Sequence, residues 1–111
     1  MTTYRKFISL LTTIILCYLV CMGCKAKDKT FTIGVLQWTE KIHAYNQTYN
    51  GVLHGLEDKG YKQGMTLEII YKNVEQDKEL ALKTAIDFVK KEVDLMLTLG
   101  TGSTLAALKA T

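Results

Sequence analysis

The chain has 111 residues and a mass of 12.5 kDa, so it can hold one domain at most. Its composition, 48% hydrophobic and 23% charged, is that of a globular protein and excludes a disordered one. The net charge of +3 falls to +1 when Arg5 and Lys6 near the N-terminus are set aside, and no arginine then remains. Without clustered basic residues or arginine forks, we expect no nucleic-acid partner.

The start of the chain has the pattern of a secretory signal. Two basic residues precede residues 7–23, which are 17 uncharged and mostly apolar residues, and a polar stretch follows. Gly23 stands directly before Cys24, which resembles the bacterial lipobox, where the cysteine becomes the first mature residue and receives acyl chains. We therefore predict a lipoprotein signal peptide over residues 1–23, lipidation of Cys24, and a tether over residues 24–30.

Two other interpretations of this segment stay open. A run of 17 apolar residues is at the lower limit for crossing a bilayer, so an uncleaved membrane anchor is one alternative. The spacing of Cys17, Cys21 and Cys24 is also similar to the three-cysteine motif that holds an iron–sulfur cluster in radical-SAM enzymes. Such a cluster requires thiolates on an ordered loop, whereas these cysteines lie in an apolar run. We predict no cofactor and no metal site.

From residue 31 the hydrophobic pattern changes between strand and helix. Phe31–Gln37 is short and nearly all apolar, which predicts a strand buried on both faces, and a loop over Trp38–Ala44 follows it. Apolar residues at i, i+4, i+7, i+8 and i+11 then predict a helix that ends at Gly60. The residues of this stripe are Tyr45, Tyr49, Val52, Leu53 and Leu56.

The second half repeats this alternation. Thr66–Val74 is predicted to be a second strand, and Asp77 caps a helix that runs to about Lys91. Val93–Leu99 is predicted to be a third buried strand, and the turn Gly100–Thr104 leads into a last helix. The predicted buried face of the helix after Asp77 consists of Leu82, Ala85, Ile86 and Val89.

Three strands alternating with helices predict an α/β fold, an open parallel sheet with helices on both faces and right-handed crossovers. The first strand should lie between the second and the third. The third strand would then be a bare apolar edge, which invites aggregation. We therefore expect residues 31–111 to be part of a larger domain, and the alternative is a complete small three-layer protein.

With its exported leader, this sequence resembles the ABC-transporter substrate-binding lipoproteins of the type I periplasmic-binding-protein fold, in the branch that includes aromatic amino-acid binders. The resemblance covers residues 31–111. The elements that carry it are Ile33-Gly34-Val35 with Gln37, Gly55-Leu56 before Gly60-Tyr61, Tyr71-Lys72-Asn73 with Gln76-Asp77, and Val93-Asp94-Leu95 before Gly100-Thr101.

This resemblance implies that residues 31–111 are a partial N-terminal lobe of a solute-binding domain. The whole protein would be an extracytoplasmic, lipid-anchored subunit that binds a small molecule, such as an amino acid, between two lobes and delivers it to an ABC permease. It would not be an enzyme. The chain departs from the family at Lys41-Ile42-His43, which often is a His-Pro pair, and at Gly102, which often is proline. Because both positions lie in ligand-facing loops, the resemblance does not identify the substrate.

In open α/β sheets, ligands bind beyond the carboxyl ends of the strands. The turn Gly100–Ser103 lies there, and its glycines let the backbone approach a ligand closely. Hydroxyl groups beside the free amides of a helix N-terminus suit a carboxylate. Trp38 could stack on an apolar ligand, although a tryptophan packed into the lobe is an equal interpretation. The predicted ligand-binding residues are Trp38, Thr39, Thr101, Gly102 and Ser103.

No catalytic residue is predicted. Ser103 is the one candidate nucleophile in these loops, and the spacing supplies no histidine or lysine as its base. Two alternatives to a transport subunit remain at this point. One is an exported enzyme on a flavodoxin-like sheet, and the other is a sensing module that reports ligand occupancy to a membrane kinase.

Overall fold

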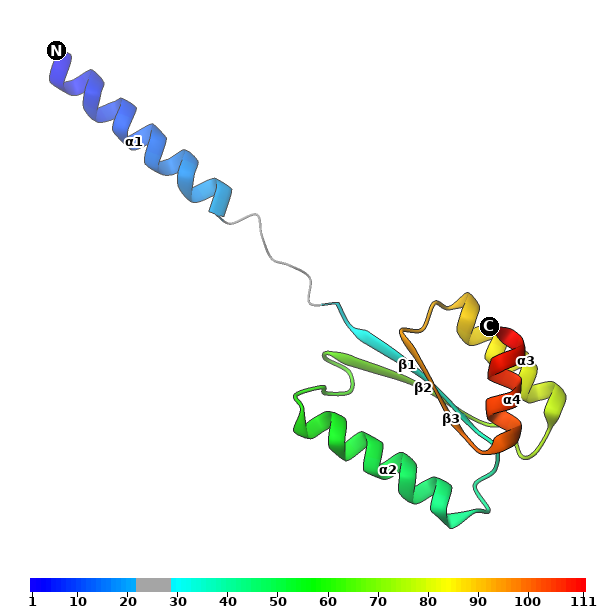
Figure 1. The fold of residues 1–111 in the computed structure, drawn as a ribbon. Coiled ribbons are helices and arrows are strands. Elements are labelled where there is room, and N and C mark those ends of the chain that lie inside the picture. Colours follow the sequence, from blue (N-terminus) through cyan, green and yellow to red (C-terminus); the bar gives the residue numbers. More distant parts are fainter. Residues whose placement is uncertain (22–28) are drawn as a thin grey trace.

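The structure is a computed structural model that describes residues 1–21 and 29–111 (Figure 1). Helix α1 spans Thr2–Cys21 and contains most of the predicted leader. The predicted lipidation site, Cys24, lies outside the described residues. Within these two ranges, no helix combines the length and the apolar character that crossing a membrane requires.

Residues 31–111 form a parallel three-stranded sheet of the predicted order. Strand β1 (Phe31–Gln37) lies between β2 (Leu67–Asn73) and β3 (Leu95–Leu99), so the order is β2-β1-β3. The α/β class is therefore confirmed. Gln37, the last residue of β1, is in register with the last residues of both neighbours, so all three carboxyl ends meet at one edge of the sheet.

Helices cover both faces of this sheet. Helix α2 (His43–Asp58) lies on one face, and α3 (Lys78–Lys90) and α4 (Thr101–Ala110) lie side by side on the other (Figure 1). Each face has its own apolar cluster, because successive strand residues point to opposite sides. On the α2 side the buried residues are Ile33, Val35, Leu67 and Leu99. On the α3 and α4 side they are Leu36, Val74, Ala81, Ala85, Phe88 and Ala106.

A glycine in β1 allows α3 to pack closely on the sheet. A Cβ atom at Gly34 would lie 2.6 Å from Cδ2 of Phe88, so only glycine leaves room for this ring. Phe88 is 1% exposed and fills the space between β1 and α3. Asp77 caps α3 as predicted, because its Oδ1 atom accepts hydrogen bonds from the backbone N–H groups of Glu79 and Leu80, each at 2.9 Å.

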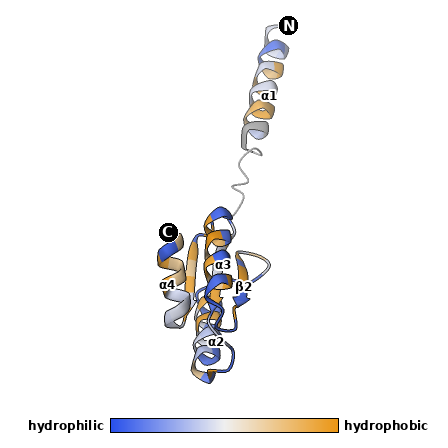
Figure 2. Cartoon of the chain, turned by 90° about the vertical axis from the view of Figure 1, so that its right-hand side faces the viewer, coloured by the Kyte–Doolittle hydropathy of each residue, from blue (hydrophilic) through white to orange (hydrophobic). Residues whose placement is uncertain are grey.

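The predicted buried face of α3 is wrong in part. Ile86 and Val89 are 39% and 43% exposed, Leu82 is half-buried, and only Ala85 is buried. The face that meets the sheet contains Ala81, Thr84, Ala85 and Phe88 instead. Small residues let the helix approach the sheet closely, and Ile86 and Val89 beside them stay partly exposed. Figure 2 shows hydrophobic and hydrophilic segments alternating along α3.

Two further expectations need correction. Strand β3 was predicted to be buried, but Leu95 is 50% exposed and only Leu99 is fully buried, because β3 forms an outer edge of the sheet. The residues predicted as a turn after Gly100 are already helical, since α4 begins at Thr101. The hydroxyl and glycine residues of that segment are therefore the first turn of α4.

At the amino edge of the sheet, an acidic side chain connects three segments. Oδ2 of Asp94 accepts a hydrogen bond from the backbone N–H of Thr32 at 2.8 Å, and Oδ1 pairs with Nζ of Lys29 at 3.0 Å. The hydrogen bond from Thr32, with a further contribution from Lys29, lowers the pKa of the Asp94 carboxyl. This contact fixes the start of β1 to the loop before β3.

Candidate ligand site at the carboxyl edge of the sheet

The segment that follows β1 is held between the exits of its two neighbours. The N–H of Trp38 donates to the carbonyl of Leu99 at 2.9 Å, and the carbonyl of Trp38 accepts from the N–H of Gln76 at 2.7 Å. The N–H of Val74 donates to the carbonyl of Gln37 at 3.0 Å. These bonds bring the loops after all three strands together, as the sheet order requires.

The junction between β3 and α4 requires glycine. Gly100 has a φ of 108°, a left-handed conformation that side chains rarely adopt. A Cβ atom there would also lie 2.7 Å from Cβ of Trp38 and 3.2 Å from the hydroxyl of Tyr45. Gly100 therefore brings the β1 exit, the start of α2 and the start of α4 into contact.

Trp38 packs on the first turn of α4. A Cβ atom at Gly102 would lie 2.5 Å from Cε3 and Cζ3 of the Trp38 ring, so the ring covers this glycine. The ring is partly buried and also packs against the cluster on the α3 and α4 side. Two predicted site residues are thus neighbours in the structure, and Trp38 forms a wall at this edge of the sheet.

The N-terminus of α4 presents free hydrogen-bond donors. Gly100 is its N-cap and provides no side-chain cap, so the backbone N–H groups of Thr101, Gly102 and Ser103 have no acceptor within the helix. Thr101 is exposed, whereas Ser103 is fully buried and its Oγ atom has no hydrogen-bond partner among the described residues. Free amides, a positive helix end and an unpaired hydroxyl are the groups that hold a carboxylate.

Thr39 is buried on the α2 side of the site. It is 1% exposed, and its hydroxyl oxygen accepts a hydrogen bond from the N–H of Lys41 at 3.2 Å, which shapes the loop. Its carbonyl accepts from Nε2 of Gln37 at 3.2 Å, and the same Nε2 donates to Oδ1 of Asn46 at 2.6 Å. Thr39 therefore serves the loop and does not expose its hydroxyl.

Gln37 is a candidate site residue that sequence reasoning missed. It is completely buried, and its Oε1 atom has no hydrogen-bond partner among the described residues. A buried polar group without a partner is rare and calls for an explanation such as a ligand or a water. The available signal was a single polar residue at the end of an otherwise apolar strand, at the edge where ligands bind.

A second group of polar side chains fixes the loop after β1 to the end of β2. The hydroxyl of Tyr71 donates to Oε1 of Glu40 at 2.9 Å, and burial together with this carboxylate raises the pKa of Tyr71. Asn73 donates to Glu75, whose other oxygen lies 3.9 Å from Nζ of Lys41. The ion pair is largely exposed and contributes little. Together these contacts order the rim of the site.

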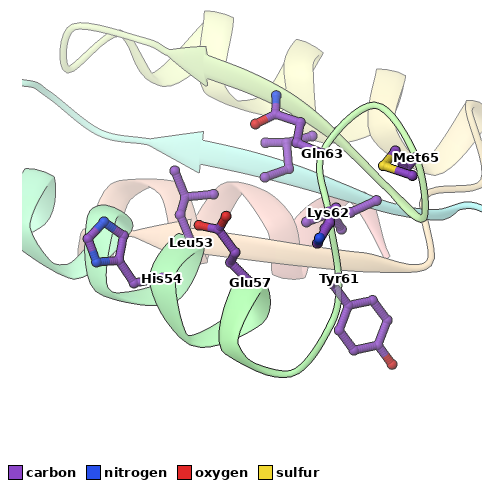
Figure 3. A pocket seen from close by; sticks show the side chains of 9 residues that line it. Leu53, His54, Glu57, Tyr61, Lys62, Gln63 and Met65 are labelled. Atoms are coloured by element: carbon purple, nitrogen blue, oxygen red, sulfur yellow. The ribbon is translucent and has the colours of Figure 1, made fainter.

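A cavity of about 520 Å³ lies elsewhere, between the second half of α2 and the loop before β2 (Figure 3). It opens near the amino ends of the strands, so none of the predicted site residues borders it. Its lining residues are Leu53, His54, Glu57, Tyr61, Lys62, Gln63, Met65, Leu67 and Ile69. The carboxyl edge of the sheet, with its unpaired buried groups, is the stronger candidate site.

The sequence matches the model of one protein family. The family described as ABC transporter substrate binding protein matches residues 32–111. A curated relative, the tyrosine-binding protein of Clostridioides difficile, is 29% identical over 96% of this chain and 35% of its own length. This chain therefore spans about a third of the length of that relative.

Solved structures with a similar fold include a substrate-binding protein. The ligand-free, open structure of a substrate binding protein with adhesive properties from Clostridium difficile has a TM-score of 0.71 and 30% identity, over 74% of this chain and 28% of that one. An ABC domain from Streptococcus pneumonia in complex with L-Trp has a TM-score of 0.69 and 26% identity, over 75% and 28%. A conserved domain protein from Vibrio cholerae has a TM-score of 0.72 and 34% identity, over the same shares.

Proposed function

This chain belongs to the ABC transporter substrate-binding protein family, and we propose that its protein is an extracytoplasmic solute-binding subunit of an uptake transporter. Residues 31–111 would form part of one of two lobes that close over a small molecule and present it to a membrane permease. The role is binding and release without chemistry, in keeping with the names of its relatives. The observation that carries this proposal is the unpaired N-terminus of α4 at the carboxyl edge of the sheet.

We assign the ligand carboxylate to the first turn of α4. The amides of Thr101, Gly102 and Ser103 point out of the helix end, where the helix dipole favours negative charge. The buried Ser103 hydroxyl would donate a further hydrogen bond, and its Oγ atom has no partner among the residues that the structure describes. Thr39 would contribute by shaping the opposite rim through its bond to Lys41.

An aromatic amino acid is the ligand that best fits this arrangement. Trp38 lies on Gly102, directly beside the proposed carboxylate site, so its ring can contact an apolar side chain at short range. One relative is named for tyrosine, and one structural neighbour was solved with L-Trp. The side-chain Oε1 atom of Gln37, which has no partner among the described residues, is a further acceptor for a ligand donor such as an amino group.

Membrane attachment completes the proposal. We propose that residues 1–23 are a signal peptide, that Cys24 is acylated, and that residues 24–30 are the tether to the lobe. The support is the Gly23-Cys24 pair after an apolar run. Each buried methylene contributes roughly 0.8 kcal/mol, so two or more acyl chains would hold the protein on the membrane.

Ser103→Ala tests the proposed site, because the two roles of this serine predict different results. If the hydroxyl binds the ligand carboxylate, the variant loses a hydrogen bond to a charged group, which contributes about 1.5–3 kcal/mol, and should bind L-tyrosine or L-tryptophan at least about tenfold more weakly by calorimetry. The free protein should unfold at the same or a higher urea concentration, since a buried unpaired hydroxyl is removed. Unchanged affinity together with unchanged or increased stability would contradict the assignment of Ser103 to the ligand.

A further inference from the structure

The loop after β2 contains two consecutive residues in the left-handed conformation. Glu75 has a φ of 46° and Gln76 a φ of 65°, and the N–H of Asp77 donates to the carbonyl of Val74 at 2.9 Å. This is the pattern of a type I′ turn, which favours asparagine and glycine at its two central positions. Longer side chains are strained in this conformation, and backbone strain of this kind gathers at functional sites.

The fold accounts for only one of these two side chains. Glu75 accepts a hydrogen bond from the side-chain amide of Asn73. The side chain of Gln76 is exposed and makes no hydrogen bond in the part of the chain that the structure describes, while its backbone N–H donates to the carbonyl of Trp38 at 2.7 Å. Glycine would keep that backbone bond and relieve the strain. The side chain of Gln76 therefore has a role outside the packing of this lobe.

Gln76 lies across the candidate site from the N-terminus of α4. The strand order β2-β1-β3 places the exit loops along the carboxyl edge in the order Gln76, Trp38, Gly100. Neighbouring strands are about 4.8 Å apart, so the exits of β2 and β3 are separated by about 10 Å, with Trp38 between them. An extended tyrosine or tryptophan has a comparable length from its carboxylate to the polar end of its ring. A ligand with its carboxylate at α4 and its ring along Trp38 therefore brings that polar end to Gln76.

We propose that Gln76 recognises the polar end of an aromatic ligand, which is the phenol hydroxyl of tyrosine or the indole N–H of tryptophan. This inference rests on the proposed function, because it takes the carboxylate at α4 and the ring at Trp38 as given. Oε1 of Gln76 accepts a hydrogen bond from either group. Phenylalanine has no polar group at this end, so Gln76 sets the preference of the site for tyrosine over phenylalanine.

Gln76→Gly tests this assignment, with L-tyrosine and L-phenylalanine as the two probes for calorimetry on the mature, full-length protein. Wild type should bind tyrosine about 3- to 10-fold more tightly than phenylalanine, which is the ratio that one neutral hydrogen bond gives. Gln76→Gly should bind both amino acids with nearly the affinity that wild type has for phenylalanine. The urea midpoint of the variant should rise, because glycine adopts the left-handed conformation without strain.

Glu92→Gly is the matched control. Glu92 has a φ of 53° after the C-cap of α3, where a single left-handed residue is a common helix ending, and it lies before β3 at the opposite edge of the sheet. This variant should also raise the urea midpoint, and it should keep the wild-type preference for tyrosine.

Four results would overturn the proposal while leaving the proposed function standing. They are a wild type without preference between the two amino acids, a preference that survives in Gln76→Gly, an equal loss of affinity for both amino acids in that variant, and a lower urea midpoint of that variant. An equal loss would assign the side chain to the facing lobe, and a lower midpoint would assign it to the fold. A wild type that binds neither amino acid would contradict the proposed function, and this inference with it.

Discussion

Gly102→Ala should reveal how tightly Trp38 is held against α4. The new Cβ atom would lie 2.5–2.6 Å from three atoms of the ring, whereas ordinary contacts are 3.4–4 Å, so the ring must recede by about 1 Å. It cannot recede freely, because Cβ of Trp38 also faces Gly100 at close range. Overpacking of this kind costs about 1–3 kcal/mol, against which alanine in a helix gains at most about 1 kcal/mol over glycine.

The matched control is Gly51→Ala in α2. A Cβ atom there meets nothing within 4 Å, so this variant should only gain helix stability, by up to about 1 kcal/mol. We therefore expect the free energies of unfolding of the two variants, measured in urea, to differ by about 1–3 kcal/mol. Trp38 is the single tryptophan of these 111 residues, so in the full-length protein with any later tryptophans replaced, its emission should shift in Gly102→Ala alone. Equal stabilisation of both variants with unchanged emission would refute the packing of Trp38 on Gly102.

Three other predictions address stability and attachment. Asp77→Ala should lower the free energy of unfolding by about 1 kcal/mol, because two N–H groups of α3 lose their cap, and an unchanged urea midpoint would contradict this. The pKa of Asp94 is lowered in the folded state, so its charge stabilises the fold above about pH 4 and less as the pH falls further. Asp94→Asn should therefore have a lower melting temperature than wild type at neutral pH and nearly the same melting temperature in acid. A difference in melting temperature that does not change with pH would argue against this role. Cys24→Ala should abolish labelling by a radioactive fatty acid in cells, and labelling that persists would rule out acylation of this residue.

The sheet could be predicted because its signals are local. Phe31–Gln37 is nearly all apolar and too short for a typical helix, and the alternation of strands with helices favours the observed strand order. The face of α3 could not be predicted in the same way. Its apolar residues occupy more than one side, and the choice depends on Gly34, which lies over 40 residues away and admits Phe88.

The proximity of two candidate site residues could be predicted, but the contacts of the others could not. Trp38 and Gly102 are neighbours because both follow strands that pair in the sheet. The roles of Thr39 and Gln37 depend on hydrogen bonds between loops, and a sequence pattern does not specify these. The early start of α4 at Thr101 also lacked a signal, because Gly100 caps it through its backbone conformation and not through a side chain.

The central claim is that the N-terminus of α4 holds the carboxylate of an amino-acid ligand. Calorimetry on the mature, full-length protein can compare L-tyrosine and L-tryptophan with tyramine and tryptamine, which lack only the carboxylate. Hydrogen bonds to a charged group contribute about 1.5–3 kcal/mol, so each amine should bind at least about tenfold more weakly than its amino acid. Amines that bind as tightly as the amino acids would contradict the claim.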